Sequence, residues 1–218
     1  MIQIEQTADG SNTLFLPELN EHYHSVKGAR TESEHIFINM GLKHSSVDVP
    51  RVLEIGFGTG LNAFLTLLEA EQSKRPVHFT TIERFPLSEE LVRQMDYPGL
   101  INPAHEAAYY ALHQAPWNVS VNITPFFTLH KIEGDFTTYP FEGNYDVVYF
   151  DAFAPEKQPE MWSQELFDTL YEKMNPGGIL TTYCAKGVVR RMLQSSGFTV
   201  ERLPGPPGGK REILRATK

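Results

Sequence analysis

The chain has 218 residues, of which 41% are hydrophobic, and this length suits one domain with a full apolar core better than two. Its formal net charge of −8 argues against a general nucleic-acid-binding protein, because contacts to phosphates need clustered lysine and arginine. No apolar run approaches the roughly 20 residues that cross a bilayer, and the first residues lack the pattern of a secretory signal. The single cysteine, Cys184, is interpreted as a small buried hydrophobic side chain. We therefore expect a cytoplasmic protein without a membrane segment.

The first 48 residues differ in pattern from the rest of the chain. Short apolar groups at residues 13–16 and 35–38 alternate with polar turns, which favours a hairpin or a cap. We therefore divide the chain into an N-terminal extension, residues 1–48, and one domain, residues 49–218. In the extension, His22 and His24 lie beside Glu21, but no third ligand is evident and no metal site is expected.

From residue 51 onward, apolar runs alternate with helical patterns, which is typical of βαβ units and a parallel sheet. A helix is predicted at residues 188–195. Strands are predicted at residues 51–55, 78–82, 126–132, 146–150, 178–183, 198–202 and 212–216. The pattern predicts an α/β, Rossmann-like fold with a seven-stranded, mostly parallel sheet and helices on both faces. Ligands of such sheets bind beyond the carboxyl ends of the strands, so the residues after each run are the site candidates.

A glycine-rich turn follows the first predicted strand. The segment Leu53-Glu-Ile-Gly-Phe-Gly-Thr-Gly-Leu-Asn62 leads into an amphipathic helix, so a ligand can approach bare backbone at a helix N-terminus. A dinucleotide site needs Gly-x-Gly-x-x-Gly, and the third residue after Gly58 is Leu61. The pattern instead resembles the first motif of class I methyltransferases, in which the loop wraps the aminoacyl part of S-adenosylmethionine. The resemblance implies that the cofactor is bound by Glu54, Gly56, Gly58, Gly60 and Asn62.

Two further strand ends carry a carboxylate. Glu83 ends the second strand at the distance from the glycines that suits a hydrogen bond to ribose hydroxyls. After the third strand, Glu133-Gly-Asp135-Phe136 resembles the methyltransferase motif that holds the adenine amino group. The sequence therefore predicts Glu83 as the ribose ligand and Asp135 as the adenine contact.

The fourth predicted strand ends at Asp151, followed by aromatic residues and prolines. This loop resembles the Asp-Pro-Pro-Tyr loop of methyltransferases that modify amino nitrogens. Methyl transfer from a sulfonium is an in-line displacement, so the protein has chiefly to hold a neutral amine opposite the sulfur. Asp151 can accept a hydrogen bond from that amine and offset the charge that grows on nitrogen. Phe153 and Trp162 are predicted to wall the pocket or stack on a base, with core packing as the alternative for both.

Several segments together carry a more specific resemblance. They are Gly56-Phe-Gly-Thr-Gly-Leu-Asn62, Glu83-Arg-Phe-Pro-Leu87, Asp151-Ala-Phe-Ala-Pro-Glu-Lys-Gln-Pro-Glu-Met-Trp162, Lys186-Gly-Val-Val-Arg-Arg-Met-Leu193 and Gly209-Lys-Arg-Glu212, with His22-Tyr-His-Ser25 and Glu32-Ser-Glu-His-Ile-Phe-Ile38 in the extension. The chain resembles, over nearly its whole length, the methyltransferase half of the bifunctional tRNA 5-methylaminomethyl-2-thiouridine biosynthesis protein family.

This resemblance implies methylation of the aminomethyl nitrogen of a modified wobble uridine, in the anticodon region of tRNA. It implies that Tyr23 closes over the cofactor. The implied substrate contacts are Phe153, Pro155, Lys157, Trp162, Lys186, Arg190, Lys210 and Arg211. The chain is too short to hold the FAD-dependent oxidase half of the fused protein, so a separate oxidase is the expected partner in the same pathway.

The charge distribution fits a polyanionic substrate. Residues 183–218 carry eight basic and two acidic side chains, so this tail has a charge of +6 and the preceding residues −14. Such polarity can focus a polyanion onto one face, although ordinary solvated charges would give the same count.

Two other classes of function fit the same motifs. One is a methyltransferase or an aminopropyltransferase that acts on a small amine. The other is a module that binds S-adenosylmethionine without catalysis.

Overall fold

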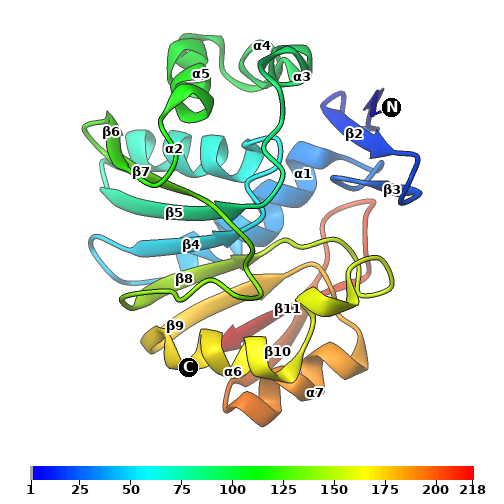
Figure 1. The fold of residues 1–218 in the computed structure, drawn as a ribbon, viewed down its shortest axis with the longest axis vertical. Coiled ribbons are helices and arrows are strands. Elements are labelled where there is room, and N and C mark those ends of the chain that lie inside the picture. The colour runs from blue at the N-terminus through cyan, green and yellow to red at the C-terminus, as the bar shows by residue number, and fades with distance from the viewer. Residues whose placement is uncertain (1) are drawn as a thin grey trace.

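The apolar runs of the sequence form the centre of an eight-stranded sheet, with strand order β10-β11-β9-β8-β4-β5-β7-β6 (Figure 1). The computed structural model describes residues 2–218. Five neighbouring strands are parallel, and they are β9 (Met174–Thr182), β8 (Tyr145–Phe150), β4 (Arg51–Ile55), β5 (Val77–Glu83) and β7 (Phe127–Glu133). At one edge, β11 (Glu212–Thr217) runs antiparallel to β9, and β10 (Thr199–Pro204) runs antiparallel to β11. The predicted α/β fold with a mostly parallel sheet is confirmed.

Helices cover both faces of the sheet, because side chains of a strand point alternately to opposite faces. On β4, Val52 packs with α2 (Leu61–Ser73), whereas Leu53 packs with α6 (Gln164–Glu172) and α7 (Gly187–Ser196). On β8, Tyr149 and Phe150 divide between the same two faces. All six residues of β8 are buried, as expected for the central strand of a doubly covered sheet.

One strand of the sheet is absent from the sequence prediction, which gives seven strands instead of eight. The additional strand, β6 (Ser120–Thr124), pairs antiparallel with β7 at the sheet edge. None of its residues is fully buried, so it lacks the apolar run by which the other strands are recognised. The connection from β5 to β6 also contains α3 (Glu89–Met95), α4 (Tyr97–Ile101), the 3₁₀ turn η3 (Pro103–His105) and α5 (Glu106–Gln114).

The N-terminal extension begins with a small antiparallel sheet of β1 (Gln3–Gln6), β2 (Asn12–Leu16) and β3 (Glu21–His22). It continues through α1 (Ala29–Ser33), the π-helical segment η1 (Glu34–Asn39) and the 3₁₀ turn η2 (Leu42–His44). A hairpin therefore exists at residues 13–16, but residues 35–38 are helical.

The sequence does not decide the form of residues 35–38, because a short run of buried apolar residues does not distinguish helix from strand. Ile36, Phe37 and Ile38 are all buried, and Phe37 packs on Tyr149 of β8 with ring centroids 5.2 Å apart. The extension thus shares an apolar core with the α2 face of the sheet.

The parallel strands place the candidate site. Ile55 of β4 lies opposite Ile82 of β5 and Phe150 of β8, and Glu83 lies opposite Glu133 of β7. The four strands therefore end at one edge, and the small N-terminal sheet lies beside that edge (Figure 1). Among residues 2–218, no helix combines the length and apolar character that a bilayer crossing requires.

Candidate active site

A cavity of about 730 Å³ lies at the carboxyl ends of β4, β5, β7 and β8. The loops that follow these strands form one side, and residues 16–19, 23 and 24 of the extension form another. The predicted site residues that line it are Tyr23, Gly56, Gly58, Asn62, Glu83, Asp135, Asp151 and Phe153. The strand-end residues therefore converge on a single space, as the sequence predicts.

Tyr23 covers the glycine loop at Gly58. A side chain at Gly58 would place its Cβ atom 3.1 Å from a carbon of the Tyr23 ring, and the Gly58 φ of +49° already disfavours other residues. Tyr23 also packs edge-on against Phe153, with ring centroids 5.2 Å apart. Burial, and secondarily Glu83, raise the pKa of Tyr23 to about 12, so its hydroxyl stays protonated.

Glu83 connects two loops at the cavity wall. Its Oε2 accepts a hydrogen bond from the Gly58 N–H at 3.0 Å, and its Oε1 accepts one from the Phe85 N–H at 2.8 Å. A carboxylate has about four acceptor sites, so Glu83 can accept further hydrogen bonds from a ligand.

Asp135 is held in its ionised form at the next strand end. Its Oδ1 accepts hydrogen bonds from the Thr137 hydroxyl at 2.7 Å and the Thr137 N–H at 2.9 Å, and Arg84 Nη1 lies 2.8 Å from its Oδ2. The Thr137 hydroxyl and the Thr137 N–H, with a smaller contribution from Arg84, hold the pKa of Asp135 below its ordinary value, and burial opposes this shift.

Asp151, in contrast to Asp135, is not held in its ionised form. Its Oδ2 accepts a hydrogen bond from Asn62 Nδ2 at 2.8 Å, whereas burial raises the pKa of Asp151 to about 7. The hydrogen bond from Asn62 and the charge of Lys210 oppose this shift, and Glu32 adds to it. Near neutral pH the carboxyl group therefore exists in both protonation states and can accept a proton from a bound group.

Three residues that are predicted to contact the substrate instead attach the loop that follows Asp151 to other parts of the protein. Trp162 is 5% exposed, and its Nε1–H donates to the Phe153 carbonyl at 2.8 Å. Lys157 Nζ donates to the carbonyl of Leu19 at 2.7 Å. Lys186 forms an ion pair with Glu156 of the same loop. These residues do not line the cavity, and neither do Glu54, Gly60, Pro155, Arg190, Lys210 and Arg211.

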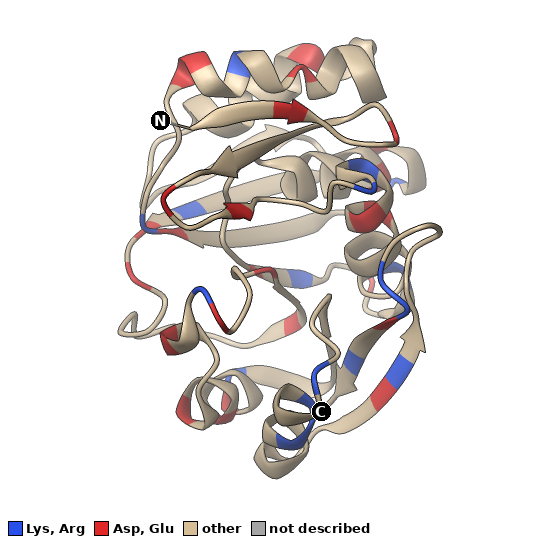
Figure 2. Ribbon diagram, turned by 90° about the vertical axis from the view of Figure 1, so that its right-hand side faces the viewer, with Lys and Arg blue, Asp and Glu red and all other residues tan. Residues whose placement is uncertain are grey.

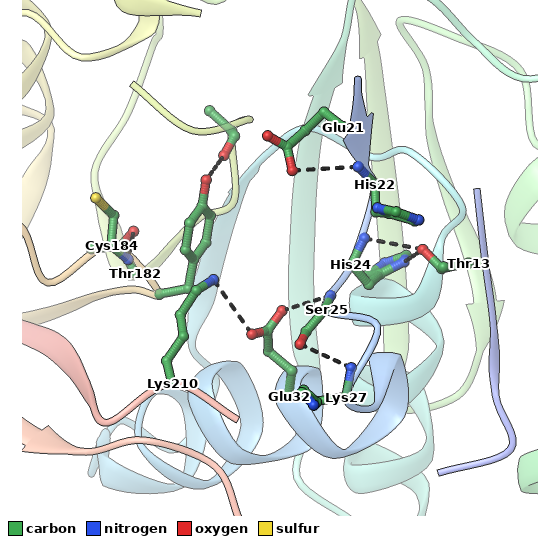
Figure 3. A network of polar contacts seen from close by, with 12 residues as sticks. Thr13, Glu21, His22, His24, Ser25, Lys27, Glu32, Thr182, Cys184 and Lys210 are labelled. Atoms are coloured by element: carbon green, nitrogen blue, oxygen red, sulfur yellow. Dashed lines mark hydrogen bonds and ion pairs between the residues drawn. The ribbon is translucent and has the colours of Figure 1, made fainter. Parts of the chain in front are cut away.

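Lys210 folds back against the protein (Figure 3). Its Nζ lies 3.8 Å from the centroid of the Tyr183 ring and 3.6 Å from Glu32 Oε2, while Glu32 Oε1 accepts the Ser25 N–H at 3.2 Å. Tyr183 in turn donates its hydroxyl to the Ala152 carbonyl at 2.8 Å. Lys210 thereby links the C-terminal hairpin, α1 and the loop after Asp151.

Much of the positive charge of the tail is paired within the molecule. Arg202 pairs with Glu212 at 3.8 Å, Arg215 pairs with Glu201 at 3.0 Å, and Lys218 Nζ donates to three backbone carbonyls at 2.7, 2.8 and 3.5 Å. The basic residues of the tail with no ion pair among residues 2–218 are Arg190, Arg191, Arg211 and Lys218, of which Lys218 is held by backbone carbonyls. In the ribbon of Figure 2, the positions of Lys and Arg alternate with those of Asp and Glu along the chain.

His24 and Thr59 form a contact that the sequence reasoning missed. The His24 ring lies between the Thr13 and Thr59 hydroxyls, 3.2 and 3.4 Å from its two nitrogens. Burial lowers the pKa of His24 to about 4, so the ring is neutral at physiological pH. No motif marks this contact, because it joins the extension to the glycine loop across the fold. Among residues 2–218, no group of His, Cys, Asp and Glu is arranged to hold a metal ion.

The cavity is strongly acidic. Five carboxylates line it, against one arginine, Arg84; they are Glu18, Glu83, Asp135, Asp151 and Glu160. Such a site attracts a cationic ligand and repels a pyrophosphate. The charge therefore supports the conclusion from the glycine spacing that the cavity is not a dinucleotide site.

Comparison with known proteins identifies relatives of the chain. Residues 122–218 match a family described as S-adenosyl-L-methionine-dependent methyltransferase. The tRNA 5-methylaminomethyl-2-thiouridine biosynthesis bifunctional protein MnmC of Pseudomonas savastanoi pv. phaseolicola is 31% identical over 92% of this chain and 32% of its own length. The chain thus spans about a third of the length of this relative.

Solved structures agree with this result. The structure of MNMC2 from Aquifex aeolicus matches with a TM-score of 0.79 and 28% identity, over 99% of this chain and 70% of the other. Spermidine synthase from Thermotoga maritima matches with a TM-score of 0.60 and 15% identity, over 100% of this chain and 72% of the other. The second match shows a shared fold alone.

The raised pKa of Asp151 predicts an effect on stability. Between about pH 4 and pH 7 the folded state binds a proton that the unfolded state has released, so stability falls as the pH rises through this range. Asp151→Asn removes this loss, and we expect its Tm to exceed that of the unmodified protein at about pH 8 and to match it near pH 4.

Asp168→Asn is the matched control for thermal unfolding. Hydrogen bonds from Ser196 and Gln164 lower the pKa of the exposed Asp168, so its ionised form stabilises the fold and its removal lowers Tm at about pH 8. Equal effects of the two variants would show that the environment of Asp151 does not favour the neutral form.

Proposed function

The chain belongs to the family of the MnmC methyltransferase domain, and on this basis we propose that it methylates the aminomethyl nitrogen of a modified wobble uridine in tRNA. The family establishes an S-adenosylmethionine-dependent methyltransferase. The observation that carries the proposal on the substrate is the Asp151 carboxyl group at the wall of the acidic cavity, held there by the Asn62 amide, because an amine substrate needs an acceptor for its proton.

The residues of the cavity fit S-adenosylmethionine. Bare backbone at Gly58 leaves space that a Cβ atom would fill, and the surplus of carboxylates suits a ligand that carries a sulfonium and an ammonium group. When bound, this cofactor supplies an electrophilic methyl group. We assign the ribose to Glu83, the adenine to Asp135 and the aminoacyl part to Gly56 and Gly58, with Tyr23 as the cover.

Asp151 is proposed to orient the substrate amine. Its carboxylate accepts a hydrogen bond from the amine N–H, which directs the nitrogen lone pair toward the cofactor side of the cavity. Positive charge grows on nitrogen during transfer, and the nearby carboxylate offsets it. The proton that the nitrogen then loses can pass to Asp151, whose pKa of about 7 permits its release to water.

The proposed tRNA surface is smaller than the charge of the tail suggests. Arg191 lies on α7, which follows the carboxyl end of β9, and Arg211 precedes β11, whose start lies at the same edge of the sheet. Both side chains are exposed. We propose that they contact phosphates of the anticodon region while the uridine approaches Phe153. A cytoplasmic location and a separate oxidase that supplies the aminomethyl group belong to the same proposal.

The decisive experiment uses tRNA that carries an unmethylated aminomethyl wobble uridine. With labelled S-adenosylmethionine, we expect one methyl group on that nucleoside by mass analysis, and at least about a tenfold lower rate for Asp151→Ala at unchanged cofactor affinity. The rate of the unmodified protein should rise with pH through about 7, because the ionised carboxylate is the active form. If the label is transferred to a free polyamine but not to tRNA, the proposed tRNA substrate is rejected and the substrate is a small amine.

The cofactor loop can be tested separately. Gly58→Ala places a Cβ atom against Tyr23 and into the cavity, and we expect cofactor affinity, measured by calorimetry, to fall at least about tenfold. Gly177→Ala is the control, since Gly177 has a φ of +77° and no atom within 4 Å of the added Cβ. If the Gly177 variant loses as much affinity, backbone strain and not the filled space is responsible.

The basic surface predicts a salt effect. Arg191→Ala combined with Arg211→Ala should weaken tRNA binding and reduce the slope of log K against log salt by about 2, with cofactor affinity unchanged. Lys74→Ala is the control, because Lys74 is 67% exposed at the far end of α2. An unchanged salt slope would remove both arginines from the tRNA surface.

A further inference from the structure

Gly60 is the third glycine of the loop after β4, and the proposed cofactor contacts give it no role. It does not line the cavity, whereas Thr59 before it does. A Cβ atom at Gly60 would lie 2.6 Å from Nε2 of His113 and 3.1 Å from its Cε1, closer than such an atom can approach. Cζ of Phe57 would lie 3.3 Å away. The space beside Gly60 is therefore filled by the protein itself and is not left for a ligand.

Two side chains of α5 contact the backbone carbonyl of Thr59. The hydroxyl of Tyr109 donates to this oxygen at 3.0 Å, and Nε2 of His113 lies 3.1 Å from it. Tyr109 and His113 are four residues apart on one helix, so both face the glycine loop. A carbonyl oxygen has two lone pairs and can accept both hydrogen bonds.

The peptide between Thr59 and Gly60 is held at both edges. Its carbonyl faces α5, and its N–H donates to the carbonyl of Phe57 at 2.9 Å. Because a peptide is planar with these two groups on opposite sides, the contacts fix its orientation. Gly58 and Gly60 both have a positive φ, +49° and +72°, which only glycine adopts readily. A loop that is already held loses less conformational freedom when a ligand binds.

The end of α5 is anchored in turn to the sheet. Lys131 of β7 is 1% exposed, and its Nζ donates to the backbone carbonyl of His113 at 2.6 Å. Carbonyls in the last turn of a helix lack a partner within the helix, so this hydrogen bond caps α5. The His113 ring also packs on Phe57, with ring centroids 4.9 Å apart. His113 is therefore held against the glycine loop from two sides.

The proton of the His113 ring has a defined place. Burial, and secondarily the charge of Lys131, lower the pKa of His113 to about 4, while the hydrogen bond to Thr59 opposes this shift. The ring is thus neutral at physiological pH and carries one proton, on Nδ1 or on Nε2. A proton on Nδ1 would leave two acceptors, Nε2 and the Thr59 oxygen, facing each other. The geometry therefore selects the form with the proton on Nε2.

We infer that Tyr109 and His113 position the cofactor loop by fixing the Thr59 carbonyl, and that residue 60 is glycine because His113 fills the space of a side chain there. Neither Tyr109 nor His113 lines the cavity, so both act through the backbone of the loop. The helical insertion between β5 and β6 thus supports the cofactor site without contact to the cofactor. This role concerns cofactor binding and holds for any methyl acceptor.

A double-mutant cycle tests the role of Gly60. Gly60→Ala pushes a Cβ atom against His113, and we expect cofactor affinity, measured by calorimetry on folded protein, to fall at least about tenfold. In the His113→Ala background the same change should cost less than about threefold, because the opposing ring is absent. Gly177→Ala, at a φ of +77° and in open space, should leave affinity unchanged in both backgrounds. An equal loss from Gly60→Ala in the two backgrounds would overturn the inference.

The two donors can be removed singly. Tyr109→Phe keeps the buried ring and His113→Leu removes the ring donor, and we expect each to weaken cofactor binding at least about threefold. His113→Gln keeps an N–H donor and should restore affinity to within about twofold of the unmodified protein. Tyr110→Phe is the control, since the Tyr110 ring packs on Tyr109 with centroids 5.5 Å apart but makes no contact to Thr59. Unchanged affinity in the Tyr109 and leucine variants would reject the role of both residues.

Nuclear magnetic resonance tests the proton of His113 without any change at the glycines. In cofactor-free protein with ¹⁵N-labelled histidine at about pH 7, two-bond ¹⁵N–¹H correlations show which ring nitrogen is protonated. We expect the His113 signals, identified by their loss in His113→Leu, to show a proton on Nε2 and none on Nδ1. A proton on Nδ1 with a bare Nε2 would refute the inference even if the glycine variants fail to fold. Neither calorimetry nor this experiment uses tRNA, so failure of the proposed substrate is a separate result.

Discussion

The common edge at which β4, β5, β7 and β8 end is the constraint on which the site depends. Parallel pairing places the residue after each strand beside the residue after the next, so Gly56, Glu83 and Asp151 meet without any direct sequence signal between them. The pairing also concentrates acids. Glu83, Asp135 and Asp151 each end or follow one of these strands and line the same cavity, which favours a cationic ligand there.

Asp135 and Asp151 in the cavity wall, and Glu54 behind it, show how neighbouring acids are held in different protonation states. Asp135 has three donors and remains ionised, Asp151 has one donor and lies near its midpoint, and Glu54 has one donor in full burial and favours the neutral form. The number of donors and the degree of burial decide each case. The three groups thus range from an ionised acid at the cavity wall to an acid within the sheet that favours its neutral form.

Sequence reasoning predicted what depends on local pattern. The parallel strands, the glycine turn and the strand-end acids follow from periodicity and spacing, and Cys184 is buried as expected. It missed β6, which has no apolar run, and it could not decide between strand and helix at residues 35–38. The sequence also could not predict the directions in which long side chains point. Lys157 and Lys186 look like substrate contacts in the sequence, yet each binds a partner that lies far away in the chain.

Lys210 shows why the charge of a segment is a poor guide to a surface. Counting places it in a tail of +6, but its ammonium group lies beside Glu32 (Figure 3) and over the Tyr183 ring. There it joins both ends of the chain to the loop that carries Asp151, since Tyr183 also holds the Ala152 carbonyl. The charge of Lys210 lowers the pKa of Asp151, whereas that of Glu32 raises it. The extension, through Glu32, and the C-terminal hairpin, through Lys210, therefore shift the pKa of Asp151 in opposite directions, and the two residues form an ion pair with each other.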